Sequence, residues 1–233
     1  AYGVVRGINP MLTPEERAEA IAGVPAGLDL LNELIDEKRK NPSDDFLSTL
    51  ITAEEDGDKL SNWEMCALIG AVLGAGSDTA VDLHSYLIRA LLSHPDQLNE
   101  LKNDEGLIQN AISETLRFES SGKTGLARYA SEDLEILGVK VKKGEMVQLI
   151  TSTAGLDPNA YEDANTFNIH RSHDNSISFG QGPHYCIGVT LVRSQTEVML
   201  KELFSRFPNL SLSGKMDYDC LLYTSPSPRD DEL

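Results

Sequence analysis

Apolar residues at helical spacing organise the first part of the chain. Thr13-Pro14-Glu15-Glu16 is a capping box with proline at the first helical position, so a helix is expected to start there and run toward Lys40. Pro25 interrupts this stretch and predicts a kink or a break. Pro42-Ser43-Asp44-Asp45 then restarts a helix that ends near Asp56-Gly57. The apolar positions of this region are Ile21, Leu28, Leu31, Ile35, Phe46, Leu47, Leu50 and Ile51.

The longest predicted helix runs from Asn62 to Ser93. A second capping box, Ser61-Asn62-Trp63-Glu64, opens it, and His94-Pro95 ends it. It is apolar on most sides, so we expect it to be buried. The residues that carry this expectation are Ile69, Val72 and Leu73. No apolar run approaches the roughly 18–20 residues that a membrane span needs, so none is expected.

Shorter elements follow downstream. The predicted helices are Asp96–Lys102, Leu107–Phe118 and Val189–Phe204, the last with Leu191, Val198, Leu200 and Leu203 available for a core. The predicted strands are Leu134–Ile136, Val139–Val141 and Met146–Ile150, after a β region that begins at Arg128. A polar meander runs from Asp157 to Asn175. The pattern therefore predicts a mainly α fold with small β sheets.

Composition narrows the partners and the compartment. The 233 residues suffice for one large domain or two small ones. A formal charge of −17 argues against binding to nucleic acid or to anionic lipid, and leaves an uncharged or cationic small molecule as a compatible ligand. Cys66, Cys186 and Cys220 are too few and too widely spaced for a disulfide scaffold. They suit a reducing compartment, so a cytoplasmic location is expected.

An unusual polar segment, Gly74-Ala75-Gly76-Ser77-Asp78-Thr79, stands in the middle of the longest helix. Each glycine costs roughly 1 kcal/mol relative to alanine in a helix interior. Asp78 and Thr79 add polar groups that need partners, and Thr79 is able to bond back to a preceding carbonyl. Small residues would let a flat cofactor and a small ligand approach the backbone. A packing notch between two crossing helices is the alternative.

The stretch from Phe179 to Gly188 holds three glycines around one cysteine, directly before a predicted helix. Gly180 and Gly182 permit unusual backbone angles, and Gly188 lets a flat group come close. Free amide groups and the helix dipole near Cys186 favour a thiolate over a thiol. A thiolate held in this way beside a flat partner suggests ligation of a haem iron. A buried structural cysteine is the alternative.

Glu114 and Arg117 lie three residues apart and so share one face of a predicted helix. A surface ion pair worth well under ~1 kcal/mol is the commoner fate of such a pair.

Three motifs together resemble those of the cytochrome P-450 family, in the expected order. Phe179, Gly182, Cys186 and Gly188 match its haem-binding loop, F-x-x-G-x-x-x-C-x-G, to which Gly180 and His184 add features common in bacterial members. Ala75, Gly76, Asp78 and Thr79 match its oxygen-activation motif, A/G-G-x-D/E-T. Glu114-Thr115-Leu116-Arg117 matches E-x-x-R.

The resemblance implies a role for each of these residues. Cys186 would ligate the haem iron, while Thr79 would bond to iron-bound dioxygen and Asp78 would relay protons. Glu114 and Arg117 would form a buried structural network with Arg171 that braces the haem fold. Arg128 and His184 would pair with haem propionates; for Arg128 an exposed strand residue is the alternative.

The resemblance covers roughly Leu12 to Leu212 and corresponds to the C-terminal half of a family member. The implied fold is a truncated cytochrome P-450 fold that lacks its N-terminal half and its C-terminal hairpin. Residues 1–212 would be part of a single haem-thiolate monooxygenase domain. Residues 213–233 do not resemble the family, and the stretch from Cys220 to Asp230 looks like a translated sequencing adapter, so an artefact is expected there. Between Ser120 and Leu126 the chain departs from the apolar pocket lining of the family.

The resulting hypothesis is a haem-thiolate monooxygenase that inserts one oxygen atom from dioxygen into a small, mostly apolar substrate. Because the chain carries no flavin or nicotinamide motif, a ferredoxin-type electron donor is expected near Arg193 and Lys201. A peroxygenase or isomerase, and an inactive fragment of the monooxygenase, stay open as alternatives. A zinc module is a further alternative; its ligands would be His170, His173, His184 and Cys186.

Overall fold

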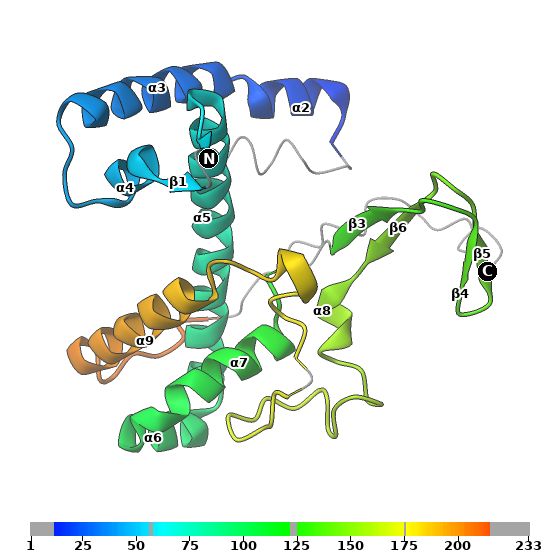
Figure 1. Ribbon diagram of the computed structural model, residues 1–233. Helices are drawn as coiled ribbons and strands as arrows, with labels where there is room; N and C mark the ends of the chain where they lie inside the picture. The colour runs from blue at the N-terminus through cyan, green and yellow to red at the C-terminus, as the bar shows by residue number, and fades with distance from the viewer. Residues whose placement is uncertain (1–11, 56–57, 122–124, 175, 215–233) are drawn as a thin grey trace. The chain divides into compact units, whose positions relative to one another are not determined.

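The computed structural model describes residues 12–55, 58–121, 125–174 and 176–214 (Figure 1). Two predicted features lie outside these ranges: the expected artefact beyond residue 214, and residues 122–124 of the segment between Ser120 and Leu126. The chain divides into two compact units, residues 1–81 and 82–233, and the boundary falls inside the long helix α5 (Asn62–Ser93). Each unit has its own hydrophobic core.

The first unit is helical, and its helices begin where the sequence predicts. Its elements are α2 (Pro14–Ile21), α3 (Val24–Lys40), α4 (Phe46–Thr52), β1 (Glu54–Glu55), β2 (Asp58–Lys59) and the first part of α5. The capping box of Thr13 is formed, and the Asp45 carboxylate accepts a hydrogen bond from the Ser48 amide at the start of α4. The two-residue strands β1 and β2 pair where the sequence predicts only the end of a helix. Ile35, Met65 and Cys66 form the core.

The second unit combines helices with two small sheets. Its helices after α5 are α6 (Pro95–Asn103), η1 (Glu105–Leu107), α7 (Ile108–Phe118), α8 (Thr151–Ala154), η2 (Gly182–His184) and α9 (Val189–Arg206). Its strands are β3 (Leu126–Tyr129), β4 (Leu134–Ile136), β5 (Val139–Val141) and β6 (Met146–Leu149). Antiparallel pairs join β3 to β6 and β4 to β5. The mainly helical fold with small sheets is confirmed.

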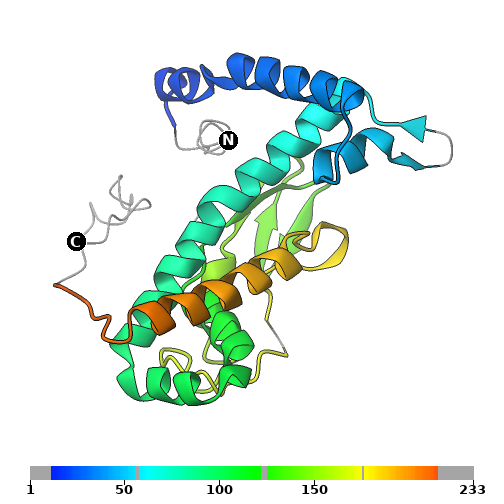
Figure 2. The ribbon, with the colours of Figure 1, turned by 90° about the vertical axis from the view of Figure 1, so that its left-hand side faces the viewer.

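The core of the second unit forms between α7, α9 and the end of α5. Ile108, Ala111, Ile112 and Leu116 line the buried face of α7, as their spacing predicts. Leu200 and Phe204 of α9 join the same cluster. Figures 1 and 2 both show α9 running alongside α7. This packing positions the cysteine loop, which leads directly into α9.

Two burial predictions are wrong. Leu73 of α5 is 52% exposed and Val72 is also exposed, while Ile69 is only partly buried against the core of the first unit. On α9, Leu191 and Val198 are exposed, and the buried face consists of Thr196, Leu200 and Phe204. Apolar spacing identifies a face that can be buried, but burial requires a segment that covers that face.

Helix α5 also differs from the expectation that no segment is long and apolar enough to span a membrane. By length and composition it could cross a membrane, because the mean hydropathy of its most apolar 18 residues is 1.4. Core helices of soluble proteins pass the same test. One such helix is therefore weak support for a membrane span.

Candidate functional site

The loop around Cys186 is held by backbone hydrogen bonds. Gly180 and Gly182 have φ angles of 74° and 73°, in the left-handed region that side chains other than glycine disfavour. The Cys186 amide donates to the carbonyl oxygen of Phe179 at 3.0 Å, so the two ends of the loop are joined. The Tyr185 amide donates to the Gly182 carbonyl at 3.0 Å. The loop is thus a closed turn that ends just before α9.

Apolar side chains close to Cys186 in the sequence are exposed. Cys186 itself is exposed, and among the described residues it has no disulfide partner. Ile187 is 91% exposed, and Tyr185 and Leu191 are exposed as well. Exposed apolar groups around a single nucleophilic sulfur are typical of a surface that a ligand covers. The buried structural cysteine considered above is therefore excluded.

The sulfur donor and the exposed apolar residues beside it fit a haem. Cys186 offers one soft sulfur ligand, which is the type that haem iron accepts from a protein in thiolate-ligated sites. A Cβ built on Gly188 would lie 3.8 Å from the Cys186 sulfur, in ordinary van der Waals contact, so this glycine stands directly beside the sulfur. The outward apolar residues supply a surface for a flat macrocycle.

A zinc module is not supported. No group of three or more His, Cys, Asp and Glu side chains that could hold a metal occurs among the described residues. His170 instead bonds to a Glu100 oxygen at 2.6 Å, and His173 lies beside Glu114.

The polar segment of α5 lies in the first unit and does not break the helix. The Thr79 hydroxyl donates to the Ala75 carbonyl at 2.6 Å, which is the bond back to a preceding carbonyl that the sequence predicts. Ala75, Gly76 and Thr79 are exposed and Asp78 is partly so, and a Cβ at Gly76 would meet nothing within 4 Å. Cys186 belongs to the second unit, and the roles of Thr79 and Asp78 toward iron-bound dioxygen stay predictions.

Glu114 is the centre of a buried hydrogen-bond network. It is fully buried and accepts two bonds from Arg117, at 2.7 and 2.8 Å, and one from Arg171 at 3.3 Å. Its third donor is the amide of Asn168, at 2.8 Å. The surface ion pair considered above is therefore excluded. The structure brings all three sequence-predicted residues of the network together.

Arg117 extends the network into the polar meander. Its guanidinium donates to the carbonyl oxygens of Gly155, Ala164 and Thr166 at 2.6, 2.7 and 3.0 Å. A Cβ on Gly155 would lie 2.2 Å from the Arg117 carbonyl oxygen, so no other residue fits there without movement. Sequence reasoning missed Gly155, because its glycine is required only by a close approach of distant backbone.

His173 lies next to this network without a hydrogen bond of its own. Its side chain is nine-tenths buried, and neither ring nitrogen has a hydrogen-bond partner among the described residues. The nearer nitrogen, Nε2, is 3.7 Å from Glu114 Oε2. Burial lowers the pKa of His173 from 6.5, with Arg117, Arg171 and Arg193 acting in the same direction and Glu114 opposing them.

The two predicted propionate partners are exposed. Arg128 lies on β3 and donates to the neighbouring Ala127 carbonyl at 2.9 Å. His184 ends η2 on the exposed side of the loop. Their role toward a cofactor stays a prediction.

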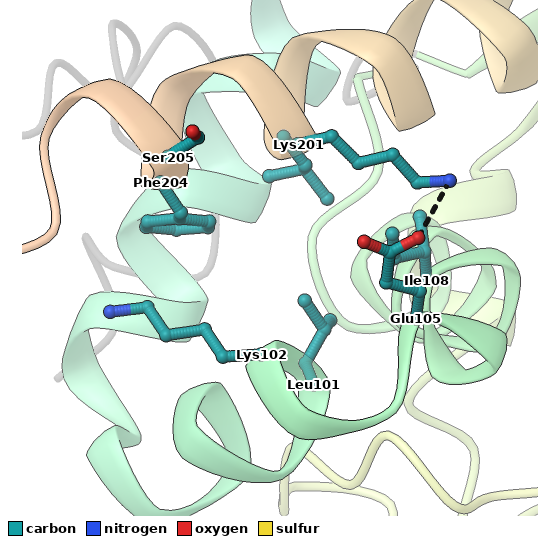
Figure 3. Close-up of a pocket in the computed structure, with 8 residues that line it drawn as sticks. Leu101, Lys102, Glu105, Ile108, Lys201, Phe204 and Ser205 are labelled. Carbon is teal, nitrogen blue, oxygen red and sulfur yellow. Dashed lines mark ion pairs between the residues drawn. The ribbon is translucent and has the colours of Figure 1, made fainter.

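A separate pocket of about 230 Å³ lies between α6, η1 and α9 (Figure 3). Its apolar wall consists of Leu101, Ile108, Leu200 and Phe204. Lys201 reaches across one side to Glu105, at 3.0 Å. None of the haem-site residues predicted above lines it.

The sequence profile of the cytochrome P-450 family matches residues 24–222. The epothilone C/D epoxidase of Sorangium cellulosum is 40% identical over 213 residues, which cover 91% of this chain and 50% of that protein. The cytochrome P-450 monooxygenase PikC of Streptomyces venezuelae is 34% identical over 85% of this chain and 48% of its own length. This chain therefore spans about half the length of the curated relatives it matches.

Solved structures agree with these relatives. The epothilone B-bound cytochrome P450epoK aligns with a TM-score of 0.85 at 35% identity, over 94% of this chain and 55% of that one. P450BioI, solved in complex with an acyl carrier protein ligated to hexadec-9Z-enoic acid, aligns with a TM-score of 0.85 at 31% identity, over 95% and 57% of the two chains.

Proposed function

This chain belongs to the cytochrome P-450 family, whose members bind thiolate-ligated haem, and from that membership we propose that the protein containing it is a haem-thiolate monooxygenase. The observation that carries the proposal is the closed loop that presents an exposed Cys186 among outward apolar side chains. When bound there, haem would supply the activation of dioxygen; one oxygen atom would enter a C–H bond or a double bond of the substrate, and the other would leave as water with two electrons from the donor and two protons.

Cys186 would hold the iron through its sulfur, and the rest of the loop would support the macrocycle. Phe179 closes the loop through its carbonyl oxygen, while Gly180 and Gly182 allow the tight turn. Gly188 leaves room beside the sulfur. Arg128 and His184 would neutralise the propionate carboxylates, because an anionic group at a buried cofactor edge needs a charged or hydrogen-bonding partner.

Asp78 and Thr79 would deliver protons to a ligand of the cofactor, and Ala75 and Gly76, as small residues, would let that ligand approach the helix backbone. The Thr79 hydroxyl has a single proton, which it now donates to the Ala75 carbonyl. To deliver this proton, the hydroxyl would have to rotate toward the reaction site. Asp78 would then replace the proton through a water molecule, with bulk water excluded from the site.

The proposed substrate is a small, mostly apolar organic molecule. The relatives support this class through their own names, which include an epothilone epoxidase and a vitamin D(3) 25-hydroxylase. An uncharged or cationic compound of this class suits a protein with a formal charge of −17 better than an acidic one would.

Electrons would come from a ferredoxin-type protein that docks near the Cys186 side of the second unit. The protein would be cytoplasmic, a location that its bacterial relatives support. Lys201 and Arg193, the expected docking cations, are both engaged within the chain. Lys201 pairs with Glu105 at 3.0 Å and with Glu197 at 2.9 Å, while Arg193 bonds to α7. Charge reversal in Lys201→Glu tests docking. Unchanged kinetics of haem reduction by the electron donor would remove Lys201 from the proposed docking site.

The experiment that tests the function is a comparison of Cys186→Ala with Cys66→Ala in the haem-loaded protein that contains this chain. Cys66 is the matched control, because it is a buried core residue of the first unit. Only Cys186→Ala should abolish the red-shifted carbon monoxide spectrum of a thiolate-ligated haem, together with turnover by dioxygen and a reductant. If Cys186→Ala keeps both, the proposal is refuted.

Two further measurements test the alternatives, a peroxygenase and an inactive fragment. Product formation with peroxide but never with dioxygen plus reductant would favour a peroxygenase. For the 233-residue chain expressed alone we expect weak haem binding or none, because it spans about half the length of its relatives. A stable haem complex of that chain with the thiolate spectrum would contradict this expectation.

A further inference from the structure

Arg193 on α9 is the charged residue that joins the cysteine loop to α7. Its guanidinium donates to the Gln109 carbonyl oxygen at 3.2 Å, to the Gln109 side-chain oxygen at 3.3 Å and to the Ser113 hydroxyl at 2.9 Å. All three acceptors lie on α7. Arg193 is partly buried, and this burial lowers the pKa of its guanidinium.

The same guanidinium also lies over the ring of Phe179. The distance from the guanidinium carbon to the ring centroid is 5.4 Å, within the range of a cation–π contact. The Phe179 ring in turn meets Tyr185 edge-on, with 6.5 Å between the ring centroids. Phe179 is also the residue whose carbonyl oxygen accepts the Cys186 amide at 3.0 Å.

These contacts form a continuous chain of interactions from helix α7 to the backbone of Cys186. Helix α7 accepts hydrogen bonds from Arg193, and the Arg193 guanidinium lies over the Phe179 ring. The Phe179 carbonyl oxygen then accepts a hydrogen bond from the Cys186 amide. We propose that Arg193 is a positioning residue. Through Phe179 it keeps the cysteine loop closed and fixes the position of the Cys186 sulfur. The proposal rests on the haem-thiolate function proposed above and assigns Arg193 a role in retaining the cofactor.

The chemistry of arginine explains why this residue type is needed. A planar guanidinium can donate several hydrogen bonds in its own plane and still stack its face on an aromatic ring. Lysine is a compact point charge and cannot do both at once. A residue that served mainly to attract an electron donor would keep its charge free in solvent, whereas the donors of Arg193 are directed into the chain.

The test compares Arg193→Gln, Arg193→Lys and Ser113→Ala in the haem-loaded protein that contains this chain. Arg206→Gln is the matched control, because Arg206 ends the same helix and pairs with the exposed Glu202 at 2.6 Å. The rate of haem transfer to an excess of an apo-acceptor protein is measured, together with the fraction of haem that gives the thiolate carbon monoxide spectrum. Arg193→Gln should release haem about tenfold faster, which corresponds to ~1.4 kcal/mol. It should also lose part of the thiolate spectrum.

Arg193→Lys should give a smaller effect in the same direction, and so should Ser113→Ala, which removes one acceptor. The double variant Arg193→Gln/Ser113→Ala should be no worse than Arg193→Gln alone, because both changes break one path. If Arg193→Gln does not fold, the two milder variants carry the test.

Haem release and spectra identical to the parent protein in all the variants would overturn the inference, while a parent protein without any thiolate spectrum would instead overturn the proposed function. Faster haem release from Arg206→Gln than from Arg193→Gln would also count against a specific role.

Discussion

Glu114→Gln is expected to destabilise the protein far more than an ordinary loss of a surface charge. Glu114 is fully buried and accepts four hydrogen bonds, two from Arg117 and one each from Arg171 and the Asn168 amide. The substitution keeps the shape of the side chain but removes its charge and replaces one acceptor oxygen with a donor. The guanidinium of Arg117, also buried, would then be an uncompensated cation in the core.

The magnitude follows from this geometry. Removing one partner of a buried ion pair costs about 3–5 kcal/mol, because the remaining charge is left without compensation. Arg117 keeps three carbonyl acceptors, on Gly155, Ala164 and Thr166, which hold it in place and prevent it from turning to solvent. The upper half of the range is therefore expected.

The assay is denaturant unfolding of the 233-residue chain without haem, which keeps cofactor binding out of the equilibrium. Glu197→Gln is the matched control: Glu197 bonds to Gln109 and Lys201, but its side chain is 37% exposed, whereas Glu114 is fully buried. Its substitution should leave the midpoint almost unchanged. If Glu114→Gln shifts the midpoint no further than Glu197→Gln, the reasoning about the buried network is refuted.

Two glycines and one histidine give further predictions. Gly155→Ala should lower the free energy of unfolding by at least ~1 kcal/mol in the same assay, because its Cβ would overlap the Arg117 carbonyl oxygen. Gly76→Ala, in open space within α5, should raise it by up to about 1 kcal/mol, yet should weaken haem-dependent turnover if the segment faces a ligand. Burial lowers the pKa of His173 from 6.5, so the stability that its neutral form contributes is present above that pH and is lost as the pH falls. His173→Phe should therefore flatten the dependence of unfolding free energy on pH below 6.5, and an unchanged slope would contradict this assignment.

Local chemistry in the sequence determined where several helices begin. Capping residues such as Thr13, Asp45 and Ser61 bond to amides three residues away, so their effect does not depend on the rest of the chain. The same holds for the cysteine loop, whose glycines at positions 180 and 182 have the positive φ angles that the closed turn needs. The spacing of Glu114 and Arg117 likewise predicted that they share a face.

The tertiary structure alone decided which of those faces are covered and what the polar groups meet. Leu73 and Leu191 belong to apolar patterns and are nevertheless exposed, whereas Gly155, His173 and Arg193 acquire their roles from neighbours far away in the sequence. The physical reason is that capping and turn formation depend on hydrogen bonds within a few residues, while burial and close approach depend on pairs of distant segments. A single sequence records the first directly and the second only through the fold.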